Sequence, residues 1–189
     1  MTVYRLHVSL LDIAPPIWRR IEVSSDTTLG QLHKILQAAI GWQDYHLHEF
    51  RIGGPTPNYD LPGEAVKDST LKLARALPSK GATVMYTYDF GDDWAHSVVL
   101  EDIVAAEPNT TYPRVVDGSR ACPPEDCGGP YGYANLIEIL AKPRHKEYRQ
   151  MREWAGKHFD PEKFSAKAAN LLLKQTLPKS PQLRTEQLQ

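Results

Sequence analysis

Residues 120–133 carry the densest group of side chains that could do chemistry. Two carboxylates, Glu125 and Asp126, lie between the two cysteines of the chain, Cys122 and Cys127. Neighbouring prolines fix backbone angles, and three glycines allow angles that other residues avoid. Such a loop presents its side chains at fixed positions. We therefore predict that it frames a binding site.

Arg120 leaves two roles open for these carboxylates. They could face a cleft and bind a ligand together with Arg120, or Arg120 could form an ion pair that braces the loop. The thiols of Cys122 and Cys127 could pair, bind zinc or simply pack. Two cysteines alone cannot complete a structural zinc site.

A second polar group comes earlier in the chain, around a Gly-Asp-Asp turn. Its candidate binding residues are Asp89, Asp92, Asp93, Trp94 and His96. The carboxylates could bind a cation or a polar ligand, and His96 could act as a base or a ligand. Alternatively, the aspartates form the turn and the histidine packs in the core.

Five residues are candidate metal ligands. His46 and His48 are two apart on a predicted strand, so their rings leave the same face. His96, with Cys122 or Cys127, could complete a site. The chain has no HExxH or CxxC spacing, and we predict no cofactor and no resident metal.

The alternation of apolar and polar residues predicts how these groups are positioned. Strands are predicted at 3–11, 17–23, 45–52, 84–90, 94–100 and 114–116, and helices at 28–40, 68–77, 134–141, 146–155 and from 160 onward. This order predicts an α+β fold: a β-grasp-like or roll mixed sheet of hairpin, helix, strand and long hairpin, with the C-terminal helices packed on it. A proline-containing loop is expected at 55–63.

The long hairpin has a predicted register. A three-residue loop, 91–93, would place Phe90 opposite Trp94 and Tyr88 opposite His96. This pairing puts the aromatic side chains on one face of the sheet, and a slip of one residue would separate them.

Composition limits the class of protein. The chain has 189 residues, a net charge of −1 and 41% hydrophobic residues, which suits one domain at 1–175 followed by a disordered tail at 176–189. It has no membrane-length apolar run and no signal-peptide pattern, so we predict a cytoplasmic protein without membrane contact. The stretch 142–157 holds six Lys/Arg against two Glu and could contact nucleic acid.

Three motifs in combination resemble the plasmid pRiA ORF-three-like family. They are the stretches 88–96, 123–133 and 159–161, and the resemblance extends over roughly 3–174. It implies an α+β fold and an occurrence on plasmids and mobile elements. Some members carry the transposon label TnpR, but these motifs place no arginine cluster around a serine or tyrosine, as a recombinase requires. The family implies no assigned reaction and no catalytic residues.

The leading hypothesis is a non-enzymatic binding or adaptor module for an unknown protein or small ligand. Its contact surface would combine the 120–133 loop with the 89–96 hairpin. A metal-assisted hydrolase using Asp, His and Cys ligands is the first alternative. Nucleic-acid binding through the 142–157 helix is the second.

Overall fold

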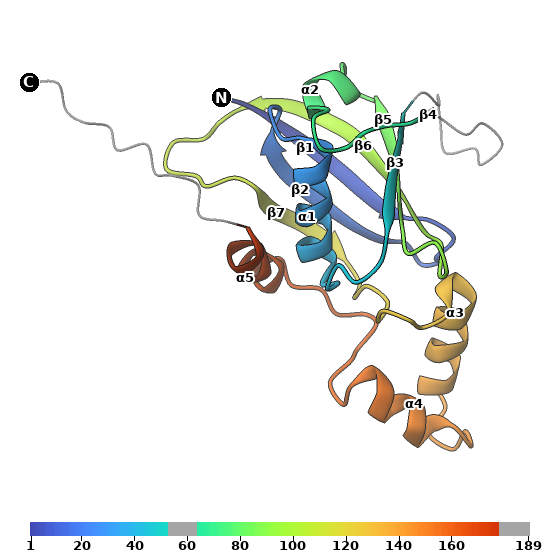
Figure 1. The fold of residues 1–189 in the computed structure, drawn as a ribbon. Coiled ribbons are helices and arrows are strands. Elements are labelled where there is room, and N and C mark those ends of the chain that lie inside the picture. The colour runs from blue at the N-terminus through green and yellow to red at the C-terminus, as the bar shows by residue number, and fades with distance from the viewer. Residues whose placement is uncertain (53–63, 178–189) are drawn as a thin grey trace, which may run out of the picture.

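The protein is built on an antiparallel sheet (Figure 1). A computed structural model describes residues 1–52 and 64–177, where seven strands follow the order β4-β3-β5-β6-β1-β2-β7. The strands are β1 (Thr2–Leu10), β2 (Ile17–Ser24), β3 (His48–Ile52), β4 (Glu64–Ala65), β5 (Thr83–Tyr88), β6 (Trp94–Ala105) and β7 (Arg114–Ser119). The helices are α1 (Leu29–Ile40), α2 (Leu73–Ala76), α3 (Gly129–Leu140), α4 (Tyr148–Ala155) and α5 (Ala166–Thr176).

The predicted α+β class is confirmed, but the mixed sheet is not. Every strand pairing in the described parts of the chain is antiparallel, including that between β1 and β6. A β-grasp arrangement would need parallel neighbours at the centre of the sheet, so the β-grasp-like description is not confirmed. The loop predicted at 55–63 and residues 178–189 of the predicted tail lie outside the described residues.

Helix α1 lies across one face of the sheet, with α5 beside it (Figure 1). It starts with a capping box: Gln31 N donates to Thr28 Oγ1 over 3.2 Å, and Thr28 N donates to Gln31 Oε1 over 2.9 Å. Leu32 and Leu36 are fully buried. Each such side chain contributes roughly 1.5–3 kcal/mol through its burial, so α1 is held mainly by its apolar face.

The long hairpin has a register two residues away from the prediction. Tyr88 pairs with Trp94, and Tyr86 pairs with His96, because the connecting loop has five residues instead of three. A shift of two leaves each side chain on its original face, so the aromatic face is buried as expected. Phe90 was predicted in the strand but lies outside β5, and it is 56% exposed.

The C-terminal helices begin at other residues than predicted. Helix α3 starts at Gly129, and α5 starts after Ser165, whose Oγ accepts from Ala168 N over 3.2 Å. The segment before α5 contains a turn, in which Lys163 N donates to the Asp160 carbonyl oxygen over 3.1 Å. It places Phe164 under the Arg19 guanidinium, 4.2 Å from the ring centroid. Helices α3 and α4 extend from one end of the sheet (Figure 1). Of the helices described, none is both long and apolar enough to cross a membrane.

Candidate functional site

The hairpin tip (residues 89–93) and the cysteine loop (residues 120–128) touch each other at one end of the sheet. Gly128 N donates to Asp92 Oδ2 over 3.1 Å, although the two residues are 36 apart in sequence. A Cβ at Gly129, whose φ is +67°, would lie 2.4 Å from the Asp92 carbonyl oxygen. Only glycine allows this approach. We call this contact region the loop junction.

Glu125 ties a third segment to the loop junction. Its Oε1 accepts from Tyr88 Oη over 2.7 Å, and its Oε2 accepts from Gln43 N over 3.0 Å. Tyr45 N donates in turn to Tyr88 Oη over 3.0 Å. Burial, and the hydrogen bond to the carboxylate, raise the pKa of Tyr88. The phenol therefore stays protonated and holds Glu125 in place.

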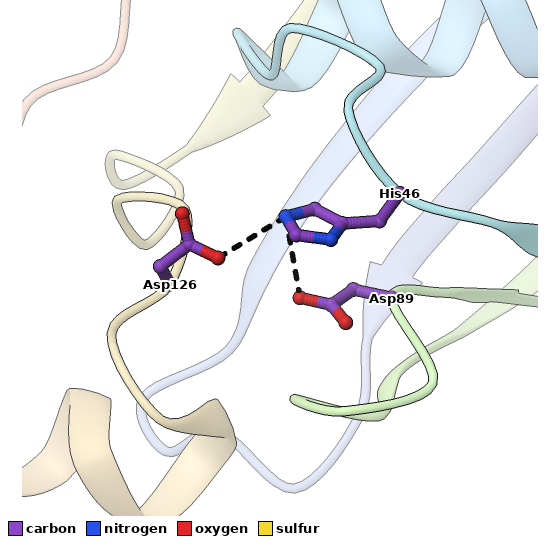
Figure 2. Close-up of side chains that lie close together, drawn as sticks. All are labelled: His46, Asp89 and Asp126. Carbon is purple, nitrogen blue, oxygen red and sulfur yellow. Dashed lines mark ion pairs between the residues drawn. The ribbon is translucent and has the colours of Figure 1, made fainter.

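His46, Asp89 and Asp126 come from three separate segments and meet at the loop junction (Figure 2). His46 Nε2 lies 3.1 Å from Asp126 Oδ1 and 3.6 Å from Asp89 Oδ2. The second oxygen of Asp89 accepts from Gly91 N over 2.9 Å, which orients that carboxylate. Asp126 is exposed, whereas Asp89 is buried. We call these three residues the His-Asp cluster.

Trp94 and His96 lie in the core, although they were predicted as contact residues. Each is 1% exposed. The Nδ1 atom of His96 lies 2.9 Å from the Trp94 carbonyl oxygen. Burial lowers the pKa of His96 to about 4, so the ring is neutral at pH 7. Strand β6 turns both residues inward, which removes them from any contact surface.

The exposed Asp93 lies on the tip, outside the His-Asp cluster.

Arg120 does not pair with the carboxylates of its own loop. It is buried, and its Nε and Nη2 donate to Glu162 Oε1 over 3.1 and 2.8 Å. Its Nη1 donates to the Pro15 carbonyl oxygen over 2.6 Å. Its role is to fasten the cysteine loop to the segment before α5.

His48 does not join His46 as a metal ligand. It stacks on His33 with a centroid distance of 3.5 Å, and its Nε2 lies 3.0 Å from Asp68 Oδ2. His33 Nε2 lies 2.7 Å from Asp44 Oδ1. Burial and the nearby His48 lower the pKa of His33. The strand β3 begins at His48, so His46 lies before it and the two rings need not leave the same face. The contacts of His48 join α1 to β3, and no pattern in the sequence indicates that pairing.

The two thiols occupy different surroundings and are both free. Cys122 Sγ accepts from Arg19 Nη2 over 3.1 Å, and burial raises the pKa of this thiol. Burial, with a contribution from Asp92, raises the pKa of Cys127 to about 12. Both are protonated at neutral pH, and a protonated thiol is a poor nucleophile and metal ligand. Neither they nor His48 and His96 belong to a metal-like cluster in the described chain.

A groove of about 430 Å³ opens beside the loop junction. Its wall includes the exposed aromatic side chains Tyr45 and Trp154, and its edge includes Glu125 and Asp126. Of the residues that line it, these two carboxylates are the charged ones. We call it the junction groove. A cavity of about 560 Å³ beside β4 and α2 contains none of the predicted site residues.

The basic stretch 142–157 includes α4, and several of its charges already have partners. Lys142 pairs with Glu138, and Arg149 with Glu153. Arg152 Nη1 donates to a backbone carbonyl oxygen over 2.6 Å. This pairing lowers the positive charge that the stretch could offer to phosphates.

The fold and the loop junction define an α+β protein in which one end of an antiparallel sheet carries a polar site beside a groove. More narrowly, the chain belongs to the plasmid pRiA4b ORF-3-like protein family, whose model matches residues 2–168, and the predicted resemblance is thereby confirmed.

Two proteins illustrate this similarity. The chain is 38% identical over 159 residues to the uncharacterized protein y4hQ of Sinorhizobium fredii (strain NBRC 101917 / NGR234), covering 82% of this chain and 81% of that protein. It also resembles the crystal structure of MM3350, a protein of unknown function from Methanosarcina mazei Go1. That match has a TM-score of 0.78 and 40% identity, and it covers 88% of this chain and 96% of the other.

Proposed function

We propose that this protein is a binding module that holds a small ligand in the junction groove. The observation that carries the proposal is the groove itself: exposed Tyr45 and Trp154 line it beside Glu125 and Asp126 at the loop junction. Its volume of about 430 Å³ lies in the range of small-molecule sites. The surrounding hydrogen bonds pre-form the site, which lowers the cost of binding.

The lining indicates the chemistry of the ligand. A planar apolar group would stack on Trp154 or Tyr45, and such aromatic contacts contribute about 0.5–1.5 kcal/mol beyond the buried area. Both oxygens of Glu125 already accept hydrogen bonds from the protein. Asp126 is therefore the carboxylate available to a hydrogen-bond donor on the ligand.

The groups around the groove favour binding over covalent catalysis. A nucleophile needs a lowered pKa or an adjacent base. Instead, burial raises the pKa of Tyr88, and it raises the pKa of Cys122 by more than the neighbouring Arg19 lowers it. These groups are in the wrong protonation state to attack a substrate.

A fragment screen followed by two-dimensional NMR tests the proposal. Fragments that contain a planar ring and an amine or amide should shift the backbone amide signals of Gln43 and Asp126. Trp154→Ala should weaken this binding about two- to tenfold, the effect of losing roughly 0.5–1.5 kcal/mol of stacking. Tyr131→Ala is the matched control, since Tyr131 is 92% exposed and lies outside the groove lining. Fragments that bind equally well to both variants would contradict the proposal.

A metal-assisted hydrolase is the second candidate function, and the His-Asp cluster favours it. Asp126 belongs both to this cluster and to the groove lining, so a metal ion there would lie at the edge of the ligand site. Such an ion could polarise a bound ester or phosphate group. Hydrolysis of nitrophenyl acetate or nitrophenyl phosphate that requires Mn²⁺ or Zn²⁺ and is lost in Asp126→Asn would support this candidate over simple binding.

A further inference from the structure

The His-Asp cluster has the spacing of ligands around one metal ion. We propose that His46 Nε2, Asp89 Oδ2 and Asp126 Oδ1 bind a single divalent transition-metal ion, Mn²⁺ or Zn²⁺. The site shares Asp126 with the junction groove, and the metal-assisted hydrolase would depend on it. Its test uses the metal ion alone, so failure of metal binding is distinguishable from failure of ligand binding in the groove.

Simple geometry supports the site. Nitrogen and oxygen ligands lie about 2.1 Å from such an ion, which places neighbouring ligands about 3.0 Å apart in an octahedron and about 3.4 Å apart in a tetrahedron. The histidine nitrogen of the cluster lies 3.1 and 3.6 Å from the two carboxylate oxygens. One ligand atom from each of the three residues lies within 4.8 Å of the others, so the three can surround one ion without a large rearrangement.

The Nε2 atom of His46 gives a second, independent indication. It is buried and makes no hydrogen bond in the described part of the chain, although two carboxylate oxygens are close to it. A buried ring nitrogen that approaches two carboxylates without a hydrogen bond is suited to share a cation with them.

The ligands are held in place by contacts that a metal ion would not disturb. Gly91 N donates to the other oxygen of Asp89, and His46 N donates to Tyr88 Oη over 3.3 Å. Asp126 directly follows Glu125, which is itself fixed by two hydrogen bonds. Second contacts of this kind orient metal ligands and strengthen binding.

The donor set indicates the kind of ion. Two carboxylates and one neutral imidazole carry a charge of −2, which balances a divalent cation. Imidazole nitrogen favours Zn²⁺ and other transition ions, while carboxylates suit Mn²⁺. Three protein ligands leave positions for water, as in catalytic zinc sites and unlike closed structural ones. Asp126 is the exposed member of the cluster, so these positions would open on its side.

Metal titration of the untagged full-length chain tests the proposal. Electron paramagnetic resonance measures free Mn²⁺, and calorimetry measures the binding of Zn²⁺. We expect one ion per chain and a dissociation constant that rises at least about tenfold in Asp89→Asn and in Asp126→Asn. Asparagine suits both positions, where φ is +56° and +58°, and it can still accept the hydrogen bond from Gly91.

Asp93→Asn is the matched control, since Asp93 is an exposed tip residue with φ of +53° outside the cluster. It should bind both ions like the unmodified chain. In a second measurement, bound Mn²⁺ should broaden the amide signals of Gly91 and Gly128 before those of Arg75 in α2. The proposal is overturned if neither ion binds, or if the control and the two cluster variants bind alike. Either result would leave His46 as a partner in ordinary ion pairs.

Discussion

Acidification should destabilise the protein through His96, a candidate binding residue that lies in the core. Burial lowers the pKa of this ring from 6.5 to about 4. If Nε2 were protonated, none of the described residues would accept a hydrogen bond from it. Between these two values the unfolded chain binds a proton that the folded chain excludes. Stability is therefore fully present above pH 6.5 and is lost as the pH falls toward 4.

The size of the effect follows from the shift. One pKa unit corresponds to about 1.4 kcal/mol, so His96 should account for roughly 2–3 kcal/mol of stability lost between pH 7.5 and pH 4.5. Urea unfolding at both pH values, followed by tryptophan fluorescence, measures this loss. Carboxylates and other histidines also titrate in this range, so the informative quantity is the difference between two chains. In His96→Gln the loss should shrink by that amount.

His158→Gln is the matched control, because His158 is exposed. It should lose as much stability on acidification as the unmodified chain. His96→Gln will be less stable at pH 7.5, but the test concerns only how its stability changes with pH. If His96→Gln and the unmodified chain lose equal stability between the two pH values, the argument from burial is wrong.

Two further predictions follow from the loop junction and from α4. Gly129→Ala should lower the free energy of unfolding by about 3 kcal/mol or more, because its Cβ would meet a hairpin-tip carbonyl oxygen at 2.4 Å. Gly81 also has a positive φ, but a Cβ there would meet none of the described residues within 4 Å, so Gly81→Ala should cost only about 1 kcal/mol. Equal losses of stability in urea unfolding would refute the close contact at Gly129. For the stretch 142–157, nucleic-acid binding would require an affinity for a DNA duplex that falls steeply with salt, measured by fluorescence anisotropy. Weak binding with a flat salt response would exclude that function.

Local patterns predicted local structure well. Helix α1 was predicted at 28–40 because its signals are local: Thr28 and Gln31, which cap its start, are three residues apart and need no distant partner. The two faces of the long hairpin were also predicted, since alternation alone sets them. Its register was not, because loops of three and five residues place the same side chains on the same faces. Whether β1 and β6 run in the same direction depends on contacts far apart in sequence, which local patterns do not indicate. The prediction of a mixed sheet was wrong for this reason.

The candidate site was predicted only in part, for a similar reason. The turn-forming residues indicated that the hairpin tip and the cysteine loop present side chains, and the two loops do meet. Trp94 and His96 were placed among the contact residues by their motif, although strand alternation turns them inward. The His-Asp cluster joins three segments, and no spacing in the sequence links His46 to Asp126.

Tyr88 links the core of the sheet to the candidate site. Its ring is buried in the core, while its one hydroxyl accepts from the Tyr45 and His46 amides and donates to Glu125. Two residues that line the groove, Tyr45 and Glu125, are thus held by the same oxygen atom. A ligand should therefore bind to a groove that is already formed. Substitutions in the buried part of the sheet should change ligand affinity even when no surface residue has changed.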